Sequence, residues 1–473
     1  MADLLSPDIC IIGGGPVGIE LALSLVAFGV SVVLVEPDRW GEKGVGRDIA
    51  LRAFSAAARH VGTIERANAF GIATGPVSVD FTALRAHIAA AVAAAAPDAS
   101  AERLAARGIW VLRSPARFTD RRTIEAGNYI VRPRRFVVAG GSAPVIPDIP
   151  GLSTVEYLTT DTTLDVKAVP ERLLVLGAGA EAVEIAQGFR RLGAQVTVVD
   201  TARALPDCDP EPAAIVLHRL RSEGILLAED RALSHVERAP SAIRVHCDSA
   251  DGPVVFDCSH LLVATGRRAE VAGLNLAAAG IRTDERGIVV GPGLRSRNRR
   301  VYAIGEATGR ASSLAAARQH IAVILPQLLF RLSRRDEPHL VPRIVWTDPE
   351  IAEIGLGIEE ARKRHGDIRL LRWPYAENDR ARAERWTTGL VRILVDQKEK
   401  VLGVTIVGEN AAELIDFWSL VLARGLALND IRSHVPPYPT FSEIGKSAAV
   451  SYDRPLMQKP WTRFLIRFLA RLG

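Results

Sequence analysis

Residues 9–18 read ICIIGGGPVG, and residues 32–36 read VVLVE. The segment that they frame predicts an apolar strand, a glycine-rich turn, a helix from about Ile19 to Phe28, and a second apolar strand that ends at Glu36. Such a turn between strand and helix, with an acid at the end of the next strand, is typical of a dinucleotide-binding unit. The segment therefore predicts an α/β fold with a parallel sheet.

Each glycine of this turn has a separate expected role. Gly13 permits the tight turn, Gly15 lets a pyrophosphate approach the backbone, and Gly18 lets the helix pack on the strand. The N-terminus of the helix then faces the phosphates. Glu36 can accept hydrogen bonds from the ribose hydroxyls of the bound dinucleotide. We assign all four residues to a cofactor-binding site.

The same pattern recurs 164 residues later. Residues 173–182 read LLVLGAGAEA, so Gly177 and Gly179 begin a second turn, and Ala182 stands where the third glycine would be. A helix to about Leu192 and a strand that ends at Asp200 complete the unit. Two such units in one chain suggest one tightly held flavin and one exchangeable nicotinamide.

The acid at the end of the second unit bears on the choice of nicotinamide. A carboxylate at Asp200 would accept a hydrogen bond from a free ribose 2′-hydroxyl and would repel a 2′-phosphate. We therefore expect NAD(P)H as substrate, with NADH favoured over NADPH. Arg203 is close enough in the sequence to weaken that preference.

Bulk properties limit the remaining possibilities. A chain of 473 residues is too long for one hydrophobic core, so two or three domains are expected. No apolar run approaches the roughly 18 residues that cross a bilayer, and no basic signal segment precedes the first strand, which favours the cytoplasm. The net charge of +5 comes largely from scattered arginines without a nucleic-acid-binding signature, so no nucleic-acid partner is expected.

The cysteines predict neither a metal site nor a redox couple. Cys10, Cys208, Cys247 and Cys258 form no CxxC, CxxxxC or metal-ligand spacing. Cys10 lies in the first apolar strand, where a buried, inert thiol is expected. Cys247 and Cys258 flank a turn and could face each other across a hairpin, a pair that we interpret as chance.

The rest of the chain predicts further helices and a separate C-terminal domain. Phe81 to about Arg107 is Ala-rich and helical, with a break near Pro97 and Asp98. Residues 338–342 are typical of a linker, and from Arg343 strands alternate with helices, as expected of an α+β domain.

These motifs, taken in order, resemble the pyridine nucleotide-disulfide oxidoreductases, or flavoprotein disulfide reductases. The chain is most similar to bacterial members of the dihydrolipoamide dehydrogenase and mercuric reductase type. Beyond the two turns, the resemblance rests on the stretches AGGSAP at 139–144, IPG at 149–151, ATGR at 264–267, YAIG at 302–305, TDPE at 347–350 and YPTFSE at 438–443.

The resemblance implies two Rossmann-like dinucleotide-binding domains plus a C-terminal α+β dimerisation domain. The FAD domain would be discontinuous, at 1–150 and 265–335, with the NAD(P) domain at 151–264 and the dimerisation domain with a terminal amphipathic helix at 341–473. The family also implies a homodimer in which each active site is completed by the partner's C-terminal domain.

Two departures from the family decide the expected chemistry. The family carries GGTCxxxxCxPSK after the first acid, whereas here the cysteine positions fall on Lys43 and Asp48, or one residue later, and the lysine position on Arg52. The family also carries HPTxxE, whose histidine is here Tyr438 while Glu443 remains. Tyrosine is a poor general base at neutral pH because its reference pKa is about 10.

From the residues and the resemblance we assign the following site. The catalytic candidates are Arg52 and Glu184, which are expected to flank the isoalloxazine ring, and Tyr438 and Glu443, which stand at the positions of the family's dyad. Lys43, Arg47 and Asp48 are expected to line the acceptor pocket. The cofactor-binding set is Gly13, Gly15, Gly18, Glu36, Arg52, Gly141, Gly177, Gly179, Asp200, Gly266, Gly305 and Glu306.

The favoured function is an FAD-dependent NAD(P)H oxidoreductase that passes hydride to flavin and then to a non-disulfide acceptor, such as a quinone or another small molecule. One alternative is a disulfide or mercuric reductase that uses other thiols. Another is a non-catalytic FAD-binding scaffold. A stretch at 46–52 is similar to part of the flavin monooxygenases, and we interpret it either as drift or as a sign that the flavin pocket resembles a direct-acting one.

The C-terminus adds one open question. In residues 461–472 apolar side chains recur at helical spacing, and Arg463, Arg467 and Arg471 form a basic ridge on another face. Such a helix can contact a membrane interface peripherally. Packing of the apolar stripe on the dimerisation domain or on the partner subunit is the interpretation that we favour from sequence.

Overall fold

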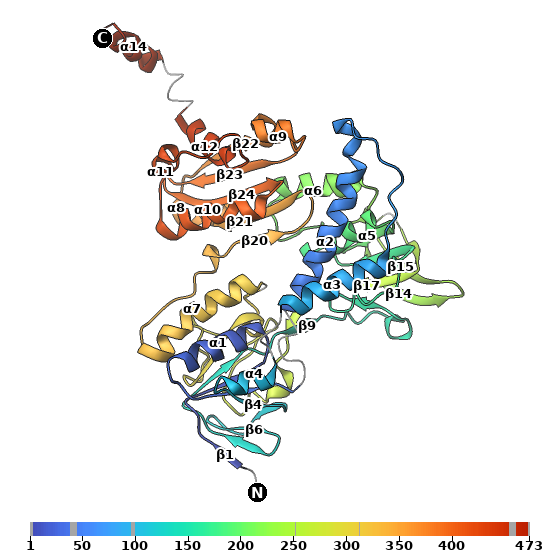
Figure 1. Ribbon diagram of the computed structural model, residues 1–473, viewed down its shortest axis with the longest axis vertical. Helices are drawn as coiled ribbons and strands as arrows, with labels where there is room; N and C mark the ends of the chain where they lie inside the picture. Colours follow the sequence, from blue (N-terminus) through green and yellow to red (C-terminus); the bar gives the residue numbers. More distant parts are fainter. Residues whose placement is uncertain are drawn as a thin grey trace. The chain divides into compact units, whose positions relative to one another are not determined.

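The computed structural model describes residues 3–37, 45–95, 100–250, 252–311, 313–453 and 460–471. Its chain separates into two compact units. The first unit comprises residues 1–203 and 224–338, and the second comprises 204–223 and 339–473. Figure 1 labels the elements of both units along the sequence colours.

The glycine turn at residue 13 belongs to a five-stranded parallel sheet in the first unit, with strand order β19-β8-β2-β3-β4. The strands are apolar and largely buried because helices cover a parallel sheet on both faces. Helix α1 (Pro16–Ala27) contacts α7 (Leu314–Phe330), and Phe28 meets Phe330 edge to face. The strand bounds are β2 Ile9–Ile12, β3 Val32–Val35, β4 Trp110–Leu112, β8 Arg135–Val138 and β19 Val301–Ala303.

The predicted first unit is confirmed with one shift of boundary. Both strands have the expected ends, but α1 begins at Pro16, three residues before the expected Ile19. Proline is favoured in the first turn because its fixed φ suits a helix and its missing N–H would have no partner there.

The second glycine turn lies in another five-stranded parallel sheet of the same unit, with strand order β10-β17-β11-β12-β13. Helix α5 (Ala180–Arg191) follows the turn, and β12 ends at Val199, directly before Asp200, as expected. The strand bounds are β10 Leu158–Thr159, β11 Arg172–Leu176, β12 Gln195–Val199, β13 Leu226–Ala228 and β17 His260–Val263.

A long helix, α2 (Val45–Glu65), packs against both α3 (Phe81–Ala95) and α5 (Figure 1). Its Phe54 is fully buried and lies 4.8 Å, ring centre to ring centre, from Phe189 of α5. A Cβ built on Gly188 would lie 2.2 Å from Phe54 Cε1, so α2 can approach α5 this closely only because residue 188 is glycine.

The predicted helix after Phe81 forms two helices, α3 and α4 (Ala101–Ala106). The break expected near Pro97 and Asp98 falls outside the described residues. Smaller sheets complete the first unit: β1-β7-β6-β5, the pair β18-β9, and β14-β15-β16. Their bounds are β1 Asp3–Leu5, β5 Ala116–Phe118, β6 Ile124–Ala126, β7 Tyr129–Val131, β9 Ser142–Pro144, β14 Ala232–Ala239, β15 Ala242–Asp248, β16 Val254–Cys258 and β18 Arg267–Ala269.

The hairpin of β15 and β16 corrects one expectation. Cys247 pairs with Val254, whereas Cys258 pairs with Ile243, four residues further from the turn. The two cysteines therefore lie at opposite ends of the strand pair and do not face each other. The hairpin itself was predicted correctly, but its register could not be read from two cysteines that flank a turn of uncertain length.

The second unit is built on a five-stranded antiparallel sheet, with order β20-β21-β24-β23-β22. The expected alternation of strands and helices is confirmed, and it includes β23 (Leu390–Val395), β24 (Val401–Gly408) and α10 (Ala411–Arg424). The other bounds are α6 Pro210–Ser222, β20 Arg343–Val345, β21 Glu350–Gly355, α8 Ile358–His365, β22 Arg369–Pro374, α9 Asp379–Ala383, α11 Leu428–Ser433, α12 Glu443–Val450 and α14 Pro460–Leu469.

Helix α6 joins this unit although it lies between two elements of the first unit in the sequence. Arg392 of β23 is 3% exposed and donates to both carboxylate oxygens of Asp209, at 2.6 and 2.9 Å. Asp209 also caps α6 by accepting the Glu211 N–H. The buried arginine thus ties the middle of the chain to the C-terminal sheet.

Candidate active site

The first glycine turn leaves no room for side chains. The Gly13 N–H donates to the Val35 carbonyl at 2.9 Å, which places the turn directly at the end of β3. A Cβ on Gly13, at φ +119°, would lie 2.2 Å from the Ala139 carbonyl oxygen, and one on Gly18 would lie 2.0 Å from the Gly13 oxygen. Both glycines are therefore required by backbone contacts.

The N-terminus of α1 suits an anionic group. Gly15 occupies the N-cap position of α1 and makes no side-chain hydrogen bond. The first N–H groups of α1 therefore have no N-cap side chain as their acceptor. The Gly14 N–H donates to Glu36 Oε2 at 2.8 Å, which holds this carboxylate beside the turn. The turn, the helix start and the acid together fit the pyrophosphate and ribose of a dinucleotide.

The second turn repeats this arrangement. The Gly177 N–H donates to the Val199 carbonyl at 2.8 Å, and the Ala178 N–H donates to Asp200 Oδ2 at 2.7 Å. A Cβ on Gly177 would lie 2.4 Å from the Ala264 oxygen, whereas one on Gly179 would meet nothing within 4 Å. The protein itself leaves space at Gly179, which fits a second dinucleotide whose phosphates approach that backbone.

The other predicted cofactor residues gather at the end of the first sheet. Glu306 lies in a short 3-10 turn, η4 (Gly305–Thr308), directly after β19, and its Oε2 is 3.9 Å from a Cβ built on Gly141. Gly266, at φ +110°, leads into β18, where Arg267 Nε lies 3.9 Å from Glu306 Oε1. The structure therefore brings Gly141, Gly305 and Glu306 together at one edge of the sheet, with Arg267 beside them.

Sequence reasoning missed a buried histidine that supports this turn. His320 of α7 accepts the Gly305 N–H through Nδ1 at 3.0 Å, and its Nε2 lies 3.5 Å from Asp336 Oδ2. Nδ1 thus acts as an acceptor for the turn, and Nε2 faces the Asp336 carboxylate. A lone histidine in an otherwise apolar stretch of α7 was the available signal.

The packing of α2 on α5 brings the predicted flavin-flanking pair together. Arg52 Nη2 lies 2.6 Å from Glu184 Oε2, and the two side chains are 30% and 7% exposed. Arg52 projects from α2 and Glu184 from α5, so one ion pair links the two dinucleotide-binding halves of the first unit.

A second arginine near the start of α2 is surrounded by acids. Arg47 lies 3.4 Å from Asp161, 3.7 Å from Asp48 and 3.8 Å from Glu181. Asp161 also forms an ion pair with Arg267, whose Nη1 lies 2.6 Å from Asp161 Oδ1. Arg47 and Asp48 thus belong to a charged cluster drawn from α2, the segment after β10 and the first turn of α5. Lys43, the third residue expected here, lies outside the described residues.

The ionisation of this cluster reflects partial burial. Loss of water raises the pKa of the Glu181 carboxyl above its usual range, although the nearby Arg47 opposes the effect. The pKa of Asp48 is raised for the same reason and is likewise opposed by Arg47. For Arg47, burial lowers the pKa, but Glu181, Asp48, Glu306 and Asp161 together raise it, so the guanidinium stays charged.

The altered dyad lies in the second unit and does not form a pair. The Tyr438 hydroxyl donates to Asp379 Oδ2 at 3.2 Å, and the tyrosine is 72% exposed. The hydrogen bond to Asp379 raises the pKa of Tyr438 further above neutrality. Glu443 Oε2 instead accepts the Thr440 N–H at 3.2 Å, next to the start of α12. Proximity of the two residues in sequence did not predict these partners.

All four cysteines are free and buried. Burial raises the pKa of the Cys247 thiol to about 11 and that of Cys258 to about 12, and it also raises the pKa of Cys10. A thiol with such a pKa is almost entirely protonated at neutral pH and is a weak nucleophile.

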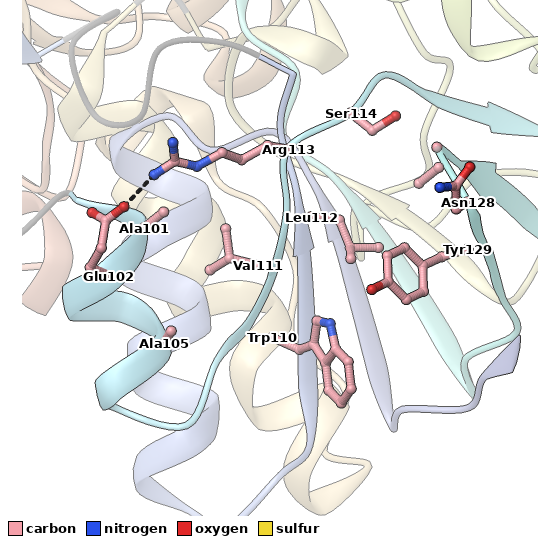
Figure 2. A pocket seen from close by; sticks show the side chains of 12 residues that line it. Ala101, Glu102, Ala105, Trp110, Val111, Leu112, Arg113, Ser114, Asn128 and Tyr129 are labelled. Carbon is pink, nitrogen blue, oxygen red and sulfur yellow. Dashed lines mark hydrogen bonds and ion pairs between the residues drawn. The ribbon is translucent and has the colours of Figure 1, made fainter. Parts of the chain in front are cut away.

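A pocket of about 600 Å³ lies at the edge of the first sheet (Figure 2). Trp110 and Tyr129 stand edge to face with ring centres 6.5 Å apart, and Arg113 pairs with Glu102 at 2.5 Å. Leu112, at the end of β4, lines this pocket, and its carbonyl accepts the Glu36 N–H. One end of the pocket is therefore close to Glu36, the acid that follows β3.

Across the described ranges, no group of three or more His, Cys, Asp or Glu side chains is placed to hold a metal ion. Within the same ranges, no helix has the length and apolar character needed to cross a membrane. The site is therefore built from the two glycine turns, the acids that follow them and the charged cluster at the start of α2.

Comparison with known proteins agrees with this geometry. Residues 7–320 match the family described as pyridine nucleotide-disulphide oxidoreductase, and residues 341–449 match its dimerisation domain. A mercuric reductase of Streptomyces lividans is 31% identical, with 94% of this chain and 96% of that protein covered. A dihydrolipoyl dehydrogenase of Thermus scotoductus is 31% identical, with 92% and 95% covered.

Among solved structures, the Cu(II) complex of the HOCl-induced flavoprotein disulfide reductase RclA from Escherichia coli superposes with a TM-score of 0.81. The alignment covers 93% of this chain and 98% of that chain, at 23% sequence identity. This likeness establishes that the described chain has the same fold.

Proposed function

The chain belongs to the pyridine nucleotide-disulphide oxidoreductase family, and we propose that it is a member that works without a redox disulfide. Members of this family are flavoprotein oxidoreductases that use FAD and NAD(P)H. In the proposal, electrons pass from NADH through the flavin directly to a small acceptor that is not a disulfide. The FAD domain would comprise residues 1–150 and 265–335, the NAD(P) domain 151–264, and the dimerisation domain 341–473.

One observation carries the proposal: the chain has no cysteine where the family places its thiol pair. Those positions fall on Lys43 and Asp48, and Asp48 lies with Arg47 in the charged cluster. A thiolate is needed to attack a disulfide or to bind a soft metal ion. The chain's own thiols are buried, and the pKa values of Cys247 and Cys258 are raised to about 11 and 12.

The two turns would divide the cofactors between them. The first turn, with Gly13, Gly18 and Glu36, would hold FAD, and the second, with Gly177, Gly179 and Asp200, would hold NADH. The bound flavin supplies the two-electron chemistry between reduced nicotinamide and acceptor. The residues of the chain position these groups, fix the local charge and limit the access of water.

The ion pair of Arg52 with Glu184 would position the flavin and nicotinamide sites relative to each other. Glu184 is 7% exposed, so an unpaired carboxylate there would be costly, and Arg52 satisfies it at 2.6 Å. Because the pair links α2 to α5, it would keep the second turn at a fixed distance from the first. Arg52 also places a positive charge where the family has lysine.

The charges near α2 favour a neutral or cationic acceptor over an anionic one. Three arginines and five carboxyl groups meet in the two ion-pair systems, so the ionised set is net negative. In the proposal the acceptor binds beside this set, whose negative potential would lower the local concentration of anionic acceptors and slow their approach. The set comprises Arg47, Arg52, Arg267, Asp48, Asp161, Glu181, Glu184 and Glu306.

The dimerisation domain indicates a homodimer. In the proposal, the partner's C-terminal domain would complete each active site and would bring Tyr438 and Glu443 to it. With its raised pKa, Tyr438 would act there as a hydrogen-bond donor rather than as a base.

The test is an anaerobic stopped-flow experiment on the FAD-loaded enzyme. Mixing with NADH should bleach the flavin absorption, and a second mixing step should restore it with a neutral naphthoquinone. The sulfonated naphthoquinone should react more slowly because it is anionic. Lipoamide, glutathione disulfide and Hg(II) should each react about 100-fold more slowly than the neutral quinone, because no reactive thiolate is present.

A variant with all four cysteines replaced by alanine is the matched control. It should keep the quinone rate, and the wild type should label with iodoacetamide at neutral pH only after unfolding. Loss of disulfide or Hg(II) turnover in this variant would instead establish a thiol-based reductase. Failure of NADH to bleach the flavin would leave an FAD-binding scaffold and reject the enzyme proposal.

A further inference from the structure

The C-terminal helix α14 (Pro460–Leu469) has an apolar face that nothing in the described chain covers. None of its residues is buried. Trp461 is 58% exposed, Phe464 71% and Phe468 51%. Packing of the stripe on the dimerisation domain is therefore not seen within the described residues, and packing on the partner subunit stays a prediction. An isolated helix shorter than about 12 residues is marginal in water, so the helix needs an external surface to stabilise it.

The charged side chains of α14 are segregated from this face. Arg463, Arg467 and Arg471 are four residues apart, so they fall within a sector of about 80° that lies next to the apolar face of the helix. The Ala470 N–H donates to the Ile466 carbonyl, and the Arg471 N–H donates to the Phe468 carbonyl. The helical turn therefore continues to Arg471, the third arginine. An aromatic and aliphatic face beside an arginine ridge is the pattern of a helix that lies in a membrane interface.

The net charge of the protein is concentrated in this tail. The chain has 59 Lys and Arg and 54 Asp and Glu, and residues 454–473 contain five of the basic residues and no acid. The first 453 residues therefore carry 54 of each sign and are formally neutral. A tail that holds the whole net charge of the chain needs a negatively charged partner for complementarity.

The helix also lies outside the part of the chain that the family explains. The match to the dimerisation domain ends at residue 449. Conservation of the family's subunit interface therefore gives no reason for Trp461, Phe464 or Phe468 to be apolar. The apolar residues of α14 therefore have to be explained from the helix itself.

We propose that α14 docks the protein onto an anionic phospholipid surface. The apolar face would enter the boundary between headgroups and acyl chains, where tryptophan is favoured, and the three arginines would face the headgroup phosphates. Ten helical residues span only about 15 Å, so the helix lies along the interface and does not cross it. Because the buried area is small, attachment depends on anionic lipid and is reversible.

The test is co-sedimentation of the full-length, FAD-loaded protein with two kinds of vesicle. One kind contains phosphatidylglycerol mixed with phosphatidylcholine, and the other contains phosphatidylcholine alone. The protein should pellet with the first and remain in solution with the second. Salt at about 1 M, where the Debye length falls to about 3 Å, should release it.

Two charge-matched variants separate the helix from general charge. The triple variant Arg463→Gln, Arg467→Gln and Arg471→Gln should bind about 100-fold more weakly, since each arginine near an anionic surface is worth about fivefold. The control variant Arg362→Gln, Lys363→Gln and Arg364→Gln loses the same charge from exposed positions on α8 and should bind like the wild type.

The apolar face has its own variant, Phe464→Ser with Phe468→Ser, which should also remain in solution while the fold is unchanged by circular dichroism. Equal binding of wild type and the arginine variant would overturn the proposal, and so would equal binding to both kinds of vesicle. If the wild type does not pellet but a chain ending at Pro460 is monomeric or less stable, α14 is a subunit contact. That outcome rejects the lipid surface and leaves the proposed enzyme untouched.

Discussion

The two glycine turns of the first unit share a hydrogen-bond pattern but differ in tightness. In both, the first glycine donates to the last carbonyl of the following strand, and the next N–H donates to the acid after that strand. In the first turn, Gly18 is required because a Cβ would lie 2.0 Å from Gly13. At the equivalent place the second turn carries Ala182, which is buried.

In the proposed assignment the first turn holds FAD and the second holds the nicotinamide. The first glycine is closed by a backbone oxygen in both turns, and only the first turn is closed in this way at its third position. The second accepts a methyl group at its third position and leaves open space at Gly179. A looser turn suits a cofactor that must leave after each turnover.

The strongest way to break this comparison is to replace the first glycine of each turn. In Gly13→Ala and Gly177→Ala the new Cβ would meet a carbonyl oxygen at 2.2 and 2.4 Å, at a φ that alanine disfavours. Each should cost about 3 kcal/mol or more of local stability. Gly13→Ala should lose FAD, whereas Gly177→Ala should keep FAD and lose NADH affinity, as measured by flavin content and NADH titration.

Gly29→Ala is the control for these variants, because Gly29 has φ +74° but a Cβ there would meet nothing within 4 Å. It should cost only the roughly 1–2 kcal/mol of the left-handed conformation. Loss of flavin from Gly177→Ala would show that the two turns do not divide the cofactors as proposed.

The packing of α2 on α5 gives a test of intermediate size. Gly188→Ala forces a Cβ to 2.2 Å from the buried Phe54 ring, an overpacking that typically costs about 1–3 kcal/mol. Phe54→Leu removes ring atoms at that point, so the double variant should be more stable than the two single effects predict. Urea unfolding should give a coupling of about 1 kcal/mol. Additive effects would mean that the two halves are not tied through this contact.

The smallest expected effect concerns the acids after the two turns. Asp200→Asn keeps an oxygen that can accept the Ala178 N–H but removes the charge that would face a 2′-phosphate. The ratio of kcat/KM for NADH over NADPH should fall about tenfold, or about 1.4 kcal/mol. Glu36→Gln makes the same change in the first turn and should leave that ratio unaltered. A wild-type preference for NADPH would mean that Arg203 outweighs Asp200.

The sequence predicts the local parts of this site well. A strand, a turn and a helix are specified by residues within about 30 positions of one another, so the apolar runs and glycines identify both units and their acids. Arg52 and Glu184 were predicted to flank the isoalloxazine ring, and their ion pair at 2.6 Å was not predicted from the sequence. Their catalytic role stays a prediction.

Contacts between distant segments could not be predicted in this way. Arg47 meets Asp161 and Glu181, which are more than 100 residues away, and nothing in the local pattern selects them. His320 accepts the Gly305 N–H because α7 packs against the turn that contains Gly305. The local sequence does not specify that contact. The Tyr438 hydroxyl donates to Asp379, the first residue of α9, which is 59 residues away, and nothing in the sequence around Tyr438 selects that partner.

The bidentate pair of Arg392 with Asp209 makes the C-terminal unit dependent on the middle of the chain. Residues 339–473 alone would lack α6, and Arg392 would lose the carboxylate to which it donates two hydrogen bonds. The sheet would also lose its contacts with α6, so this fragment should be less stable than the unit that includes residues 204–223. The C-terminal unit is therefore not built from one continuous stretch of chain. Its helix α6 is synthesised before residue 338, and a chain cut at residue 338 would separate α6 from the rest of the unit.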